Sequence, residues 1–186
     1  MMRRCLPALM IVLFSPLVAA ENTIDLNVNN DAARIMAGFE LSNNLMVDGS
    51  WFHNSDRGDV VGAGFHVTGD ATGGRNPLKA GLGVRLLQVD PDIGPDDGTV
   101  LPIGGFVNYT LPEYDRFVVG GSLYYAPEVL SFGDATKYWE YNAWAGYSVL
   151  RNGLVYAGLR GIRADFENTS SITLDTGLHV GLRLEF

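Results

Sequence analysis

Ser50, His53, Ser55 and Asp56 come nearest to a catalytic grouping in this sequence. A serine activated by a histidine and an acid can perform acyl transfer, but sequence spacing does not establish the geometry of such a triad. The chain lacks the Gly-x-Ser-x-Gly elbow that exposes a nucleophilic serine on a sharp turn. Serines and acids are also ordinary loop residues, so the sequence predicts that the protein is not an enzyme.

The acidic segment Asp90–Gly98 is a second place where chemistry could occur, because its carboxylates could bind calcium. Its spacing, however, lacks the EF-hand pattern and the terminal glutamate of that motif. We therefore interpret the segment as a solvated acidic loop. The sequence predicts no metal site and no cofactor.

The C-terminal segment Leu174–Phe186 indicates which kind of element positions the polar residues. Successive side chains of a strand point to opposite faces. One face would carry Leu174, Thr176, Leu178, Val180, Leu182, Leu184 and Phe186, and the other Asp175, Gly177, His179, Gly181, Arg183 and Glu185. The segment exceeds the roughly 5–6 residues usual in soluble strands and is long enough to cross a bilayer at a tilt. It is typical of the closing strand of an outer-membrane β-barrel.

The same alternation recurs in nine earlier segments. They are marked by Ile24–Val28, Ile35–Leu41, Leu45–Trp51, Val61–Val67, Leu78–Leu86, Leu101–Tyr109, Phe117–Tyr125, Trp139–Val149 and Val155–Leu159. Together with the last segment they predict an all-β fold, a transmembrane antiparallel up-and-down β-barrel of ten strands.

The connections between these segments indicate how the barrel is oriented. Short turns at 42–44, 112–115 and 151–153 alternate with longer polar connections at 54–58, 90–99, 127–135 and 165–170. Outer-membrane barrels have short periplasmic turns, longer external loops and an even number of strands. The pattern fits a chain that enters the barrel from the periplasm. The Gly-rich connection 69–76 is long for a periplasmic turn, so eight strands is the alternative count.

The composition of the second face argues for a membrane barrel. A soluble lipocalin-like barrel would also alternate, but its outward face would be rich in Lys, Glu and Thr. Here that face carries mainly glycine and isolated charges, and glycine weakens a solvated strand. Inside a narrow barrel, glycine leaves room for long arginines. We therefore place the apolar face toward lipid and the glycine face toward the lumen.

The charged residues of the lumen face are the main candidate site. Charges surrounded by a low-dielectric wall must be paired, and small barrels are filled by side chains. We interpret these residues as a structural network that fills the lumen: Glu40, Asp48, Lys79, Arg85, Glu140, Arg160, Asp175, His179, Arg183 and Glu185.

Aromatic residues lie toward the ends of the predicted strands on the apolar face. Tryptophan and tyrosine are enriched where a membrane meets water. The predicted interface residues are Trp51, Tyr109, Tyr125, Trp139, Tyr147 and Phe186.

Residues 1–20 have the pattern of a secretory signal peptide. Arg3 and Arg4 precede the apolar run Leu6–Val18, and the small residues Ala19 and Ala20 follow it. We expect cleavage after Ala20 and one barrel domain over 21–186. The single cysteine, Cys5, leaves with the signal, so packing or a closed hydrogen-bond ladder must stabilise the barrel. Without the signal, 11 Lys and Arg stand against 21 Asp and Glu, a net charge of −10 that argues against nucleic-acid binding.

Three stretches resemble the YfaZ family of bacterial outer-membrane proteins: Trp51–Phe65, Leu123–Ser131 and Gly177–Phe186. The most specific piece is Tyr124-Tyr125-x-Pro127-x-x-Leu130-Ser131. The resemblance runs in order through nearly all of the chain after the signal, and it implies no catalytic motif and no assigned function. The terminal Phe186 is similar to the assembly signal of membrane barrels in general. This chain departs from the family pattern in the acidic loop and near 29–35.

These observations predict a small non-enzymatic outer-membrane barrel with a filled polar lumen and a structural or surface-interaction role. A narrow channel for ions or small solutes is the alternative, and a lipid-modifying enzyme is a more distant one. The expected partners are outer-membrane lipid, lipopolysaccharide and, during insertion, the barrel-assembly machinery. Divalent cations could link the acidic loop to lipopolysaccharide phosphates. The apolar segment Val129–Phe132 either packs over the barrel mouth or contacts a partner, and a monomer is favoured.

Overall fold

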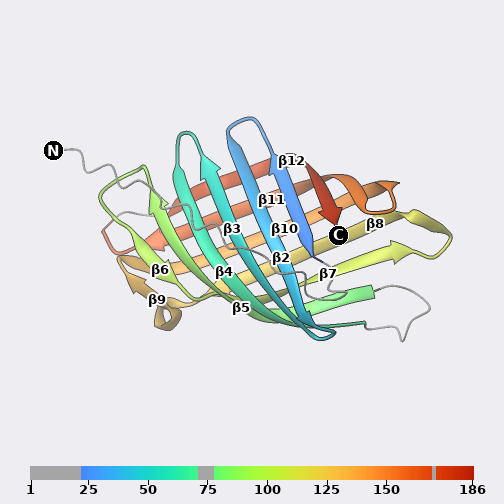
Figure 1. The fold of residues 1–186 in the computed structure, drawn as a ribbon. Helices are drawn as coiled ribbons and strands as arrows, with labels where there is room; N and C mark the ends of the chain where they lie inside the picture. Colours follow the sequence, from blue (N-terminus) through green and yellow to red (C-terminus); the bar gives the residue numbers. More distant parts are fainter. Residues whose placement is uncertain (1–21, 71–77, 169–170) are drawn as a thin grey trace.

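Ten long antiparallel strands form the molecule (Figure 1). A computed structural model describes residues 22–70, 78–168 and 171–186. The long strands are β1 (Thr23–Val28), β2 (Ala32–Ser42), β3 (Leu45–Asn54), β4 (Gly58–Asp70), β5 (Leu78–Pro91), β7 (Ile103–Leu111), β8 (Tyr114–Ala126), β10 (Ala135–Leu150), β11 (Gly153–Phe166) and β12 (Ile172–Glu185). Three short elements, β6 (Gly98–Val100), the 3₁₀ turn η1 (Glu128–Leu130) and β9 (Ser131–Gly133), lie in the connections.

The sheet closes on itself. Each long strand pairs with its neighbour along the chain, and β1 pairs with β12 from Thr23↔Glu185 to Val28↔Val180. The pairing of β4 with β5 runs from Gly58↔Pro91 to Asp70↔Lys79, so these two strands form one hairpin. The ten-strand barrel predicted from the sequence is therefore confirmed, and the alternative of eight strands is wrong. Closure gives both edges of every long strand a neighbouring strand to pair with. A hydrocarbon environment requires such pairing of backbone N–H and C=O groups.

The two ends of the barrel differ. We call the end that carries the β1–β2, β3–β4, β5–β7, β8–β10 and β11–β12 connections the loop end, and the other the turn end. At the loop end β6 pairs with β5 and with β9, so the sheet extends past the barrel there. The expected signal peptide and part of the 69–76 connection lie outside the described residues.

The outer surface is apolar along the strands. Leu82 and Leu178 are 73% and 74% exposed, and every long strand carries at least one large apolar side chain that is likewise exposed. Buried charged side chains such as Asp48, Arg85 and Glu140 have the opposite parity and face inward. Within the described ranges, no helix is long and apolar enough to cross a membrane.

One residue of the terminal strand departs from the predicted alternation. Leu174 was expected to share the outward face with Thr176, but it is fully buried inside the barrel. The pairing of β11 with β12 shifts here: Ile162 pairs with Asp175, and Arg163 pairs with Thr173. A β-bulge adds one residue to a strand and thereby reverses the alternation beyond it.

Candidate functional site

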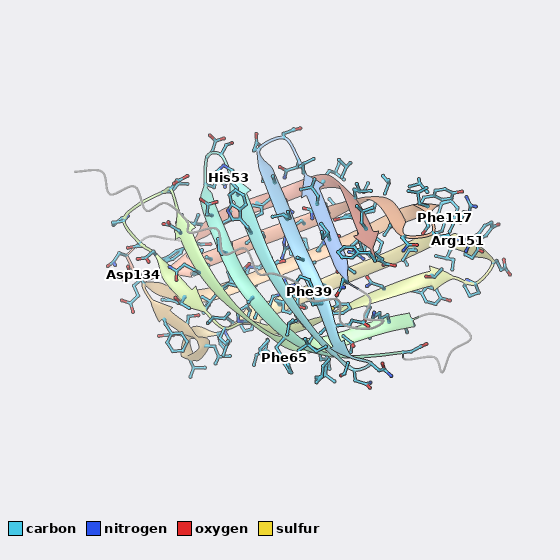
Figure 2. The ribbon with its side chains drawn as sticks, viewed as in Figure 1. Phe39, His53, Phe65, Phe117, Asp134 and Arg151 are labelled. Atoms are coloured by element: carbon cyan, nitrogen blue, oxygen red, sulfur yellow. The ribbon has the colours of Figure 1, made fainter. Side chains whose placement is uncertain are left out.

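The lumen is the candidate functional site, and it is organised in three zones along the barrel. An apolar cluster fills the loop end, a network of charged and hydroxyl side chains crosses the middle, and a cavity occupies the turn end. We call these the plug, the polar layer and the turn-end cavity. Figure 2 labels Asp134 near the plug and Arg151 near the cavity, at opposite ends of the molecule.

The plug consists of buried side chains from strands all around the barrel. Phe52, Leu87 and Ile162 are at most 2% exposed, although they come from β3, β5 and β11. The remaining members are Ala32, Val60, Val89, Val100, Ala126, Ala135, Tyr138, Ala164, Phe166, Ile172 and Leu174. The sequence predicted a polar lumen. The structure differs at the loop end, where the interior of the barrel is a hydrophobic core.

Hydrogen bonds between connections cover the plug. Arg57 Nη1 of the β3–β4 connection donates to the carbonyl oxygen of Thr173 at 2.5 Å. Asn168 Nδ2 donates to Asp96 Oδ1 at 3.3 Å, and the Glu167 amide donates to the Asp134 carbonyl at 2.9 Å. Connections that are far apart in the sequence are thus joined across the barrel mouth.

On one side of the polar layer, Glu140 and Asp48 each hold a close partner. Arg34 Nη1 lies 2.6 Å from Glu140 Oε1, and the Tyr138 hydroxyl donates to Glu140 Oε2 at 2.8 Å. His66 Nδ1 lies 3.0 Å from Asp48 Oδ2, and His66 Nε2 lies 2.8 Å from the Tyr124 hydroxyl oxygen.

A second chain of contacts crosses the other side. Arg160 Nε donates to Asp175 Oδ2 at 2.6 Å, and its Nη1 also donates to Asn27. The Tyr156 hydroxyl donates to Asp25 Oδ1 at 2.5 Å, and Arg183 Nε donates to Asp25 Oδ2 at 2.9 Å. The buried charges are therefore paired, as a low-dielectric interior demands.

Inward glycines make room for these side chains. A Cβ atom on Gly64 would lie 2.3 Å from Asp48 Oδ2 and 3.0 Å from Arg85 Cγ. A Cβ atom on Gly181 would lie 2.3 Å from the Tyr156 ring. The glycines thus accommodate rings as well as the arginines that the sequence suggested.

The turn-end cavity has a volume of about 340 Å³. Arg34, Arg85 and Glu140 of the polar layer line it, and so do Arg151 and Asn152 of the β10–β11 turn. It therefore extends from the middle of the barrel to the turns, whereas the plug closes the opposite direction.

The ten lumen residues predicted from the sequence occupy different positions. Asp48, Arg85, Glu140, Arg160, Asp175 and His179 are buried, with exposures of 1–5%. Lys79 pairs with Glu40 nearer the turn end, and Glu185 lines the rim of the cavity. His179 makes an edge contact with Tyr156, and neither of its ring nitrogens has a hydrogen-bond partner among the described residues.

Several members of the polar layer were missing from that prediction. They are Asp25, Asn27, Arg34, His66, Tyr124, Tyr138 and Tyr156. Each lies on the inward parity of its strand, so a complete reading of the alternation would have found them. Their pairing depends on contacts across the lumen, which strand periodicity does not give.

Most of the predicted interface aromatics lie outward. Trp51, Tyr125, Trp139, Tyr147 and Phe186 are 39–61% exposed, whereas Tyr109 is partly buried. Trp139 pairs with Tyr125 near the loop end, and Tyr147 pairs with Phe117 near the turn end.

The residues weighed for catalysis are not brought together. His53 faces outward on β3, where its Nδ1 lies 2.9 Å from Oδ1 of Asp59, an acid outside the group Ser50, His53, Ser55 and Asp56. Ser50 has the inward parity of the same strand, and the Ser55 hydroxyl donates to the Asp31 carbonyl. Within the described part of the chain, no group of three or more His, Cys, Asp or Glu side chains is arranged to hold a metal ion.

The segment Val129–Phe132 was expected either to pack over the barrel mouth or to be exposed for a partner, and its residues divide between these two positions. Leu130 packs against the plug, whereas Val129 and Phe132 are 79% and 55% exposed.

Comparison with known proteins identifies a family for this chain. The family model described as "YfaZ precursor" matches residues 2–186. This chain belongs to the YfaZ family. It is 31% identical to Outer membrane protein YfaZ of Escherichia coli (strain K12) over 144 residues, which cover 76% of this chain and 75% of that protein. A solved structure titled "KdgM porin" is similar over 89% of this chain and 99% of that one, with 11% identity and a TM-score of 0.46. The protein is thus an exported outer-membrane β-barrel.

Proposed function

We propose that this protein is a closed, non-enzymatic outer-membrane barrel with a structural or surface-interaction role. The observation that carries this proposal is the plug, whose Phe52, Leu87 and Ile162 close the lumen from different walls. Among the described residues, an apolar core covered by joined connections lies between the cavity and the loop end, which supports a closed lumen. Barrels that conduct freely have many more strands, about 16–18, and a water-filled interior.

Planar-bilayer recording of the purified, refolded protein tests closure. We expect no steady conductance steps, with a general porin reconstituted in the same way as the positive control. Steady steps from the pure protein would contradict the proposal and favour the narrow channel.

A narrow channel is the second candidate, and the turn-end cavity favours it. A partly polar cavity that extends from the turn end to the middle of the barrel could form the turn-end part of a path for solutes. If the plug is a gate, then Phe52→Ala together with Leu87→Ala should produce stable conductance in a protein that still folds. A silent double variant with the normal heat-modified gel mobility would argue against gating.

Surface interaction is supported by the exposed Val129 and Phe132, because exposed apolar side chains at a barrel mouth can contact a partner. Replacing these two residues by serine leaves Leu130 in the plug. We expect normal folding and weaker attachment of cells to surfaces. Unchanged attachment would remove the support for this role.

A lipid-modifying activity has the least support. His53 and Asp59 are 2.9 Å apart at the outer surface, but Ser50 faces the lumen. Mass spectrometry of lipid A from cells with wild-type protein or His53→Ala should show no acyl difference. Lipid, lipopolysaccharide and the assembly machinery, which would recognise Phe186, remain the partners that we propose, with the chain acting as a monomer.

A further inference from the structure

Arg85 lies where the polar layer meets the turn-end cavity, and its hydrogen-bonding capacity is largely unused. The residue is 5% exposed. Its Nη1 is 3.6 Å from Glu140 Oε1 and its Nη2 is 3.6 Å from Asp48 Oδ1, both beyond hydrogen-bond distance. Its Nη2 also lies 3.6 Å from the sulfur of Met36, a weak acceptor, and its Nε has no partner among the described residues. The charge of Arg85 is thus paired, but buried hydrogen-bond donors without partners are costly and call for an explanation.

The neighbouring acids pair with the charge of Arg85 but do not hydrogen-bond to its guanidinium. Glu140 is engaged by Arg34 at 2.6 Å and by Tyr138 at 2.8 Å. Asp48 Oδ2 lies 3.0 Å from His66 Nδ1, and Asp48 Oδ1 has no hydrogen-bond partner among the described residues. The guanidinium also lies over the Tyr124 ring, 4.2 Å from its centroid, which fixes its position.

We propose that the turn-end cavity binds a small monocarboxylate on the guanidinium of Arg85. The planar fork of arginine matches a carboxylate with two parallel hydrogen bonds. Arg34 also belongs to the cavity lining, so a second guanidinium lies at the site. Asp48 and Glu140 already offset the charges of Arg34 and Arg85. With these four charges balanced, the site disfavours a dianion, and it would hold a monoanion through the hydrogen bonds of the guanidinium rather than through net positive charge.

The cavity wall indicates the rest of the ligand. Met36, Met46, Phe106 and Val118 contribute apolar surface around the space next to Arg85. A volume of about 340 Å³ exceeds what a carboxylate group alone needs. The ligand thus combines a single carboxylate with an apolar body, and it enters from the turn end. This inference concerns binding, and it does not depend on whether solutes cross the barrel.

Fluorine NMR with trifluoroacetate as the probe tests the site in protein refolded in detergent micelles. Trifluoroacetamide has nearly the same shape without the charge, and protein-free micelles correct for partitioning. We expect saturable line broadening of trifluoroacetate and none of trifluoroacetamide. We also expect benzoate to displace the probe at lower concentration than acetate does. Non-saturable broadening, or equal binding of the amide, would overturn the site, and equal displacement by acetate and benzoate would overturn the apolar body.

Two variants assign the binding to Arg85. Arg85→Gln removes the charge while leaving the Arg34–Glu140 and His66–Asp48 pairs intact, so we expect it to fold and to bind trifluoroacetate about tenfold more weakly or worse. Arg85→Lys keeps the charge without the fork and should give an intermediate loss. Arg163→Gln, on the outer surface, is the matched control and should bind as the wild type does. Undiminished binding by both folded Arg85 variants would overturn the assignment.

Discussion

At the scale of single residues, the interior depends on charges that hold one another and on glycines that leave them space. Glu140 has two partners within 2.8 Å, and the guanidinium of Arg34 is almost fully enclosed. The two side chains are 9% and 2% exposed, so each charge depends mainly on the other for stabilisation. The polar layer is therefore sensitive to the loss of one partner and much less sensitive to the loss of both.

Replacing Arg34 by Met should destabilise the barrel strongly. Glu140 would keep Tyr138 as a donor but would lose its close cation, which costs about 3–5 kcal/mol for a buried pair. The double variant Arg34→Met with Glu140→Leu should recover much of this loss. Urea unfolding in lipid vesicles measures both. Additive losses in the double variant would contradict the pairing.

Gly64 and Gly69 provide a matched pair on β4. A Cβ atom on Gly64 would collide with Asp48 Oδ2 at 2.3 Å, whereas no atom of the described residues lies within 4 Å of one on Gly69. Gly64→Ala should therefore cost about 1–3 kcal/mol of unfolding free energy, as overpacking does. Gly69→Ala should be close to neutral in the same unfolding experiment. Equal effects would show that Gly64 is not needed for the packing of the polar layer.

At the scale of elements, strand alternation predicted the ten long strands, because the side-chain period depends only on the local backbone. It did not predict the bulge that turns Leu174 inward, since a bulge leaves no mark on the apolar pattern when the extra residue is itself buried. It also could not separate the plug from the polar layer. That separation depends on which residues of β3, β5 and β11 meet across the lumen.

The bulge in β12 can be tested with single cysteines, because the only native cysteine is Cys5. Thr176→Cys should react with a membrane-soluble maleimide, and Leu174→Cys should not, because Leu174 is fully buried in the plug while Thr176 is exposed. A regular strand would place both thiols on the same outer face. Similar reaction rates for the two folded variants would therefore exclude the bulge.

At the scale of the whole molecule, the barrel is asymmetric along its axis. Among the described residues, the plug and hydrogen bonds such as Arg57 to Thr173 occupy the loop end, whereas the cavity lies at the turn end. The side of the membrane that the cavity faces therefore depends on the orientation of the barrel. If the turns are periplasmic, as the loop lengths predict, the cavity faces the periplasm and the plug faces the exterior.

Cysteine labelling in intact cells decides the orientation. Ser148 lines the cavity near the turn end, and Asp134 lies in the β9–β10 connection at the loop end. A membrane-impermeant maleimide should label Asp134→Cys in intact cells, whereas Ser148→Cys should react only after the outer membrane is opened. If the plug closes the lumen, as we propose, Ser148→Cys stays protected in intact cells even though the reagent is small. The reverse pattern would invert the barrel, and labelling of both sites in intact cells would mean that the lumen is open.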